Sequence, residues 1–184
     1  MRFRLFPFAL LLAGVSWAQG PVASGTALSF SRSMTAPLNA GQFFDRALDA
    51  WTWTFGKEPG AKVIHSDRTT GVIEATARLN FRSTMLTGRE ESMGTISYHV
   101  QIQTRAGECR MTVTNMQHTG NRNTATGGIH LKQLMRADQD AYKARGLGRA
   151  NIVRLHGELR TASEERIGQL LQAYEARIRA HIEP

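Results

Sequence analysis

The sequence predicts an α+β fold, with an N-terminal helix packed on a four-stranded antiparallel sheet and a helical C-terminal tail. Apolar residues recur at helical spacing from Phe44 to Phe55, apolar and polar residues alternate in runs from Val72 to Met116, and helical spacing returns after residue 130. Alternation gives a sheet one packed face and one wet face, which antiparallel sheets allow and parallel sheets rarely do. The first helix has an apolar stripe of the right width to cover the packed face.

Residues 1–18 have the order of a secretory signal. Arg2 and Arg4 give a positive start, the run Leu5–Val15 is apolar, and small residues stand at the two positions that a signal peptidase reads. The run is shorter than the ~20 apolar residues that span a bilayer, and no later run replaces it, so we expect no transmembrane segment in the mature chain. We therefore expect an exported protein, periplasmic or extracellular, that begins near Gln19.

The composition fits one globular domain with an appendage. Of the 184 residues, 41% are hydrophobic and 21% are charged. The net charge is +8, and the two arginines of the predicted signal account for +2 of it, which leaves +6. Basic and acidic residues are interspersed, without the clustered stripe of nucleic-acid readers, so we expect no nucleic-acid partner. The single cysteine, Cys109, excludes an intramolecular disulfide and falls at an inward strand position, so we expect it to be buried.

The first helix is predicted to begin after Asn39, which forms a variant of the capping box with Gln42 and is followed by helical spacing as far as Gly56. Trp53 lies about 180° from the apolar stripe, on a polar side of this helix. It is therefore covered by the tail or offered to a partner, and we favour the tail, whose apolar face needs a surface to bury. The stripe itself consists of Phe44, Leu48, Trp51 and Phe55.

Short turns join the predicted strands. Asp67–Gly71 is a turn whose glycine suits a positive φ, residues 82–93 are a polar connection, and Arg105–Glu108 is a hairpin loop. A flexible leader, residues 19–36, precedes the first helix and holds one short strand at Ala27–Ser31. The four strands of the sheet are Ala61–Ser66, Val72–Phe81, Gly94–Thr104 and Cys109–Met116.

A loop at His118–Gly128 separates the predicted sheet from the tail. The tail has helical spacing in residues 131–142 and again in 152–159, where Gly157 weakens the second helix. Thr161–Glu164 is a capping box that opens a third helix. The expected organisation is a signal peptide (1–18), a flexible leader (19–36), an α+β domain (37–129) and a C-terminal helical extension (130–184).

Several motifs follow one another in a distinctive order. They are an aromatic-rich helix at Phe44–Trp51, the hairpin Asp67–Gly71 leading into Val72-Ile73, a strand start at Gly94–Ile96, and Arg110–Asn115, where a basic residue enters the last strand. This order resembles a bacterial family known only as a domain of unknown function with a TATA-binding-protein-like (TBP-like) fold, often found in exported proteins. The resemblance implies a curved antiparallel sheet backed by helices, and it brings no catalytic residues. DNA binding does not follow, because fold does not fix function.

No motif in the sequence indicates catalysis. The six histidines show no close ligand spacing such as His-x-His, so we expect no metal site. Glu90 and Glu91 are neighbours in a loop, where their carboxylates need not converge as those of a glycosidase do. The sequence also lacks a G-x-S-x-G nucleophile elbow, a dinucleotide fingerprint and a P-loop. We therefore expect no catalytic residue, no cofactor and no enzyme activity.

The polar face of the predicted sheet is the candidate partner-binding surface. Arg78 and Arg110 on this face would contact an anion or a carboxylate, and a plain solvated face is the simpler alternative. Whether the face is open or covered by the tail is left open by the sequence. The candidate residues are Arg78, His99, Gln101, Arg110 and Thr112, with Trp53 as a possible partner or tail contact.

These observations favour a non-enzymatic binding or interaction module of the bacterial cell envelope, with an unidentified envelope protein or ligand as its partner. One alternative is an enzyme or small-ligand carrier whose site is assembled from residues distant in the sequence. Another alternative is a polyanion-binding protein that uses the dispersed basic surface.

Overall fold

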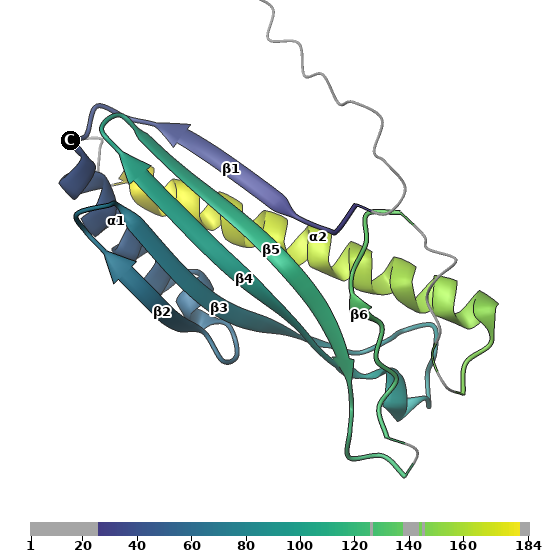
Figure 1. The fold of residues 1–184 in the computed structure, drawn as a ribbon. Coiled ribbons are helices and arrows are strands. Elements are labelled where there is room, and N and C mark those ends of the chain that lie inside the picture. The colour runs from purple at the N-terminus through teal and green to yellow at the C-terminus, as the bar shows by residue number, and fades with distance from the viewer. Residues whose placement is uncertain (1–25, 126, 138–143, 145, 181–184) are drawn as a thin grey trace, which may run out of the picture.

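An antiparallel sheet with two helices packed on one face forms the body of the protein (Figure 1). The computed structural model describes residues 26–125, 127–137, 144 and 146–180, so the predicted signal peptide lies outside the described residues. The strands are β1 (Phe30–Thr35), β2 (Lys62–Asp67), β3 (Val72–Phe81), β4 (Gly94–Arg105), β5 (Glu108–Gly120) and β6 (Lys132–Gln133). The helices are α1 (Ala40–Trp53) and α2 (Arg149–Ala180), with the 3₁₀ turns η1 (Phe55–Lys57) and η2 (Glu90–Ser92).

The sheet has six strands rather than the predicted four. The strand order is β1-β5-β4-β3-β2, and β6 pairs with β5 on a stretch that β1 leaves free. β1 pairs with residues 108–113 of β5, and β6 pairs with residues 117–118. The short strand expected at Ala27–Ser31 is therefore found a few residues later, at the edge of the sheet. Part of the segment expected to be a flexible leader is thus built into the sheet.

The start of α1 follows the prediction. The Asn39 side chain accepts a hydrogen bond from the Gln42 backbone N–H at 2.9 Å, and the Gln42 side chain accepts one from the Asn39 N–H at 3.0 Å. This reciprocal pair satisfies two backbone donors that have no partner inside the helix. The apolar stripe continues into η1, where the rings of Trp51 and Phe55 stack at 5.5 Å between centroids.

The turn between β2 and β3 also forms as predicted. Asp67 accepts hydrogen bonds from the Thr69 N–H at 2.8 Å and from the Thr70 hydroxyl at 2.7 Å. Gly71 has a φ of 71°, and a Cβ there would lie 2.3 Å from the backbone oxygen of Thr104. Any larger residue at position 71 would therefore meet both backbone strain and a clash.

The inner face of the sheet is dry, as the alternation predicts. β5 continues beyond its predicted end at Met116. Asn115 takes a φ of 53° in a bulge that shifts the alternation, and Met116 and His118 therefore both face inward. The beginning of the predicted loop at His118–Gly128 is therefore strand. The buried side chains of β3, β4 and β5 include Ile73, Ala75, Ala77, Leu79, Ile96, Tyr98, Val100, Ile102, Met111 and Val113.

The tail differs most from the prediction. Residues 131–137 are not helical, since they form β6 and a bridge between Met135 and Ala27, and residues 138–143 lie outside the described residues. The second and third predicted helices are one continuous 32-residue helix, α2. Gly157 does not interrupt it. Thr161–Glu164 is not a capping box either, because it lies in mid-helix, where the Ser163 hydroxyl donates to the Leu159 carbonyl at 2.7 Å.

Both helices pack on the inner face of the sheet, and α1 and α2 contact each other (Figure 1). Leu155, Leu159, Ile167 and Tyr174 of α2 are buried in the core. Within the described part of the chain, no helix combines the length and apolar character needed to cross a bilayer.

Candidate functional site

The predicted polar surface lies on the outer face of the sheet, opposite α1 and α2, so the helices do not cover it (Figure 1). The two arginines on it do not converge. Arg78 stands opposite Ser97 of β4, whereas Arg110 stands opposite Gln103, six positions further along the same strand. This separates them by about 20 Å along the sheet. One anion cannot contact both. The remaining members, His99, Gln101 and Thr112, belong to the same outer face.

Trp53 is 55% exposed, so the tail does not bury it. The apolar residues of α2 that were expected to cover it, among them Tyr174 and Ile178, are buried in the core instead. Among the described residues of the tail, Arg177 approaches Trp53, and its guanidinium carbon lies 5.6 Å from the ring centroid. Lys57 lies at 4.6 Å from the ring. The contact is thus a cation–π contact and not the predicted apolar one.

A groove lies between α2 and a part of the β3 edge that none of the described strands covers. β2 pairs with β3 only as far as Thr76, and the N–H of Arg78 donates to the Pro59 carbonyl at 3.1 Å. In an antiparallel pair, successive residues alternate between facing the partner strand and facing away from it. Because the N–H of Arg78 faces away from β4, so do the N–H and C=O of Asn80. These two main-chain groups line the free edge.

The groove consists of two adjoining hollows that share Asn80, Ala162 and Glu165. The inner hollow has a volume of about 300 Å³ and the outer hollow about 540 Å³. The inner hollow is also lined by Glu58, Leu79, Ile96, Arg166 and Gln169. The outer hollow is also lined by Phe81, Arg82, Thr84, Met85, Arg154, Gly157, Glu158 and Thr161.

An ion pair forms one side of the inner hollow. Arg166 of α2 donates to the carboxylate of Glu58 at 2.5 Å, and the Glu58 side chain is buried. Close to this pair, the buried hydroxyl of Tyr98 has no hydrogen-bond partner among the residues that the structure describes. Burial raises the pKa of Tyr98, and the negative charge of Glu58 raises it further. The phenol is therefore a neutral hydrogen-bond donor beside a charged pair.

A second carboxylate holds the loop that borders the outer hollow. Glu158 of α2 accepts hydrogen bonds from the Ser83 hydroxyl, from the Thr84 N–H at 2.9 Å and hydroxyl at 2.6 Å, and from the Met85 N–H at 3.0 Å. Partial burial raises the pKa of Glu158, but these hydrogen bonds outweigh it and lower the pKa below its usual value. The loop after β3 is thereby fastened to α2, with the Met85 side chain 55% exposed beside the groove.

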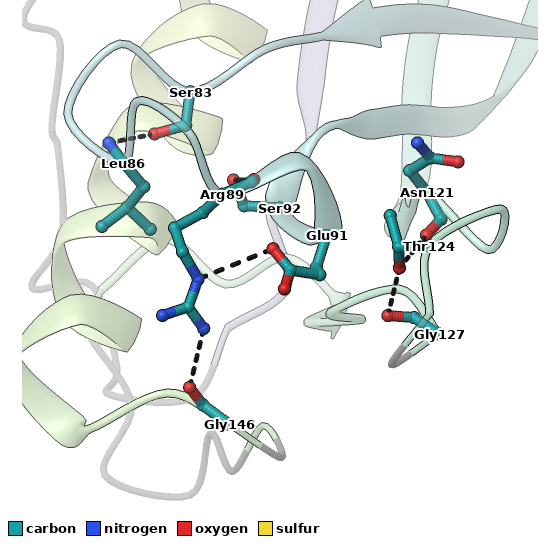
Figure 2. Close-up of polar contacts among 9 residues, drawn as sticks. All are labelled: Ser83, Leu86, Arg89, Glu91, Ser92, Asn121, Thr124, Gly127 and Gly146. Atoms are coloured by element: carbon teal, nitrogen blue, oxygen red, sulfur yellow. Dashed lines mark hydrogen bonds and ion pairs between the residues drawn. The ribbon is translucent and has the colours of Figure 1, made fainter.

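A further hollow of about 400 Å³ lies at the other end of the connection between β3 and β4. Figure 2 shows the polar contacts around it. Arg89 donates to the Gly146 carbonyl at 2.9 Å and lies 3.5 Å from the Glu91 carboxylate, while the Thr124 hydroxyl donates to the Gly127 carbonyl at 2.8 Å. The two carbonyls and the Glu91 carboxylate engage these donors, although the Arg89 Nε makes no hydrogen bond within the described residues. We interpret this region as a structural link between the connection and the approach to α2.

Two further titratable groups, His118 and Cys109, are buried in the core. His118 packs edge-on against Phe81 at 5.7 Å between centroids, and burial, with a smaller effect of His130, lowers its pKa to about 4. Cys109 is buried as expected, 3.8 Å from the Tyr174 hydroxyl, and burial raises its pKa to about 11. In the ranges that the structure describes, no three His, Cys, Asp or Glu side chains are grouped so that they could hold a metal ion.

Sequence reasoning did not single out the groove residues Glu58, Asn80, Glu165 and Arg166. One signal for Asn80 was available, because the second predicted strand is longer than the first and its end must lack a partner on one side. No comparable signal exists for the other three, which come together only through the path of α2.

Residues 34–119 match the family described as "Domain of unknown function (DUF4468) with TBP-like fold". The structure is similar to a DUF4468 family protein from Bacteroides ovatus, with 14% identity, a TM-score of 0.54 and coverage of 80% of this chain and 86% of that chain. It is also similar to a TBP-like protein from Parabacteroides distasonis, with 10% identity, a TM-score of 0.54 and coverage of 81% and 93%. No curated protein matches the sequence. The two structural likenesses show the fold alone.

Proposed function

Given that the chain belongs, through residues 34–119, to the DUF4468 family of TBP-like fold, we propose that it is an exported, non-enzymatic module of the bacterial cell envelope that binds a short extended peptide segment of a partner protein. The binding site is the groove between α2 and the free edge of β3. The export rests on the signal predicted in residues 1–18.

The observation that carries the proposal is the free main chain of Asn80 beside a hollowed surface. An extended peptide adds to an exposed sheet edge through main-chain hydrogen bonds, and pockets for alternate side chains supply its specificity. The inner and outer hollows lie on either side of Asn80, and their volumes fall in the range of ~300–1,000 Å³ typical of ligand sites. Met85 adds exposed apolar surface at the outer hollow.

The ion pair and hydrogen bonds of the two buried or partly buried carboxylates at the groove support binding rather than catalysis. A general acid or base needs a pKa near the working pH and reach to a transferable proton. Glu58 is engaged by Arg166, and the loop hydrogen bonds hold the pKa of Glu158 below its usual value. The thiol of Cys109, which is the only cysteine, is buried in the core.

The test is a peptide selection followed by two substitutions at one position. A random peptide library displayed on phage is panned on the wild-type protein, and enriched peptides are synthesised with a fluorophore for polarisation measurements. Asn80→Pro removes the outward N–H without breaking a bond to β4, while Asn80→Ala keeps that N–H.

We expect Asn80→Pro to weaken peptide binding at least about tenfold and Asn80→Ala to leave it nearly unchanged, with both variants showing the wild-type circular dichroism spectrum. Main-chain hydrogen bonds supply most of the affinity in strand addition, so the variant that loses the N–H should bind more weakly than the variant that loses only the side chain. Failure to enrich any peptide, or equal binding by a folded Asn80→Pro variant, would overturn the proposed function.

A further inference from the structure

We propose that the groove is bipolar and selects a segment carrying one basic and one acidic side chain four residues apart, the basic one at the inner hollow and the acidic one at the outer hollow. This inference rests on the proposed function and specifies the chemistry of its ligand.

The inner hollow has an uncompensated negative charge. Glu58 and Arg166 neutralise each other in their ion pair. Glu165 remains, an exposed carboxylate that makes no hydrogen bond or ion pair within the described part of the chain. A cationic side chain of the bound segment is its natural partner, and Gln169 lies beside it to accept a further N–H.

The outer hollow, which Glu158 and Glu165 also line, contains two arginines whose charges no ion pair engages within the described residues. These arginines are Arg82 and Arg154. Glu158, one turn after Arg154, would be the obvious partner for that arginine, but its carboxylate is occupied by the loop at residues 83–85. The two guanidinium groups are therefore left to bind a carboxylate.

The geometry of α2 sets the spacing of the two charges on the ligand. Arg154 and Glu165 are eleven residues apart, which is about three helical turns and about 16 Å along the axis, so both lie on the same helix face. Side chains on one face of an extended segment recur every second residue, and four residues span about 13 Å. Long side chains bridge the remaining ~3 Å, whereas a spacing of five residues would send the two charges to opposite faces.

The test uses the peptides selected above. We expect them to carry Lys or Arg and Asp or Glu at a spacing of four, in either order, because a segment can add parallel or antiparallel to β3. On the protein, Glu165→Lys is compared with Glu164→Lys, an exposed neighbour on α2 that does not line the groove. Arg154→Glu is the corresponding change at the outer hollow.

Glu165→Lys should weaken binding about fivefold or more, Glu164→Lys should leave it unchanged, and exchanging the basic residue of the peptide for Glu should restore binding to Glu165→Lys. The proposal is overturned if binding depends on the Asn80 N–H but Glu165→Lys and Glu164→Lys bind equally, or if Arg154→Glu has no effect. In that case the proposed function survives. Absence of any Asn80-dependent peptide removes both.

Discussion

The buried hydroxyl of Tyr98 leads to an unusual prediction, namely that deleting a polar group stabilises the free protein. Tyr98 is 2% exposed, and within the described ranges its hydroxyl has no hydrogen-bond partner. Burying a polar group without a partner costs about 1–3 kcal/mol. Tyr98→Phe removes the hydroxyl and keeps the ring that packs against Phe55 at 6.3 Å between centroids. We therefore expect the free energy of unfolding to rise by about 1 kcal/mol.

Tyr174→Phe is the matched control. Tyr174 is equally buried, but its hydroxyl contacts the Cys109 sulfur at 3.8 Å. Its removal should lower the free energy of unfolding by about 0.5–1 kcal/mol, the usual net contribution of such a contact. Urea denaturation followed by circular dichroism measures both variants. If Tyr98→Phe lowers the free energy of unfolding by 1 kcal/mol or more, the hydroxyl has a strong partner, and our description of the inner hollow is incorrect.

Three further predictions concern stability and reactivity. Glu158→Gln should lower the free energy of unfolding by about 1–2 kcal/mol, because the carboxylate accepts four hydrogen bonds from the loop after β3, whereas Glu164→Gln in the same urea titration should be neutral. His118 has a pKa of about 4 in the folded state and 6.5 in an unfolded chain, so the unfolded state takes up a proton first as the pH falls. The contribution of neutral His118 to the free energy of unfolding is therefore fully present above pH 6.5. It is lost as the pH drops, by about 3 kcal/mol at pH 4. Urea titrations at pH 7 and pH 4 test this, and His118→Gln should remove most of the difference. Cys109 should resist a thiol-specific reagent until the protein unfolds, since the thiol is buried and its pKa is about 11; rapid labelling under native conditions would contradict this.

Local patterns predicted the elements that depend on local chemistry. The alternation located β3 to the residue, and the capping box located the start of α1. β1 was misplaced because an edge strand is held by pairing with β5, and only Met34 of its six residues is buried. The end of β5 was missed because the bulge at Asn115 breaks the period of two. Gly157 suggested a helix break that tertiary packing of the residues around it overrides.

The candidate site was harder to predict than the fold. The sequence placed Arg78 and Arg110 correctly on one face of the sheet, but the alternation does not fix the distance between them. The two arginines pair with positions of β4 that lie far apart along that strand. The groove depends on where α2 crosses β3, and the groove residues of α2 come more than seventy residues after β3 in the chain. No pattern in one sequence connects Asn80 with Glu165, so their proximity emerges only from the three-dimensional arrangement.

Amide hydrogen exchange at Asn80, measured by NMR with and without a saturating selected peptide, tests the central claim most directly. We expect the Asn80 N–H to exchange quickly in the free protein, because it faces the open edge of β3, and to become protected on peptide binding. The N–H of Leu79, which faces β4, should be protected in both states. An Asn80 amide that exchanges equally fast with bound peptide would contradict strand addition at this edge.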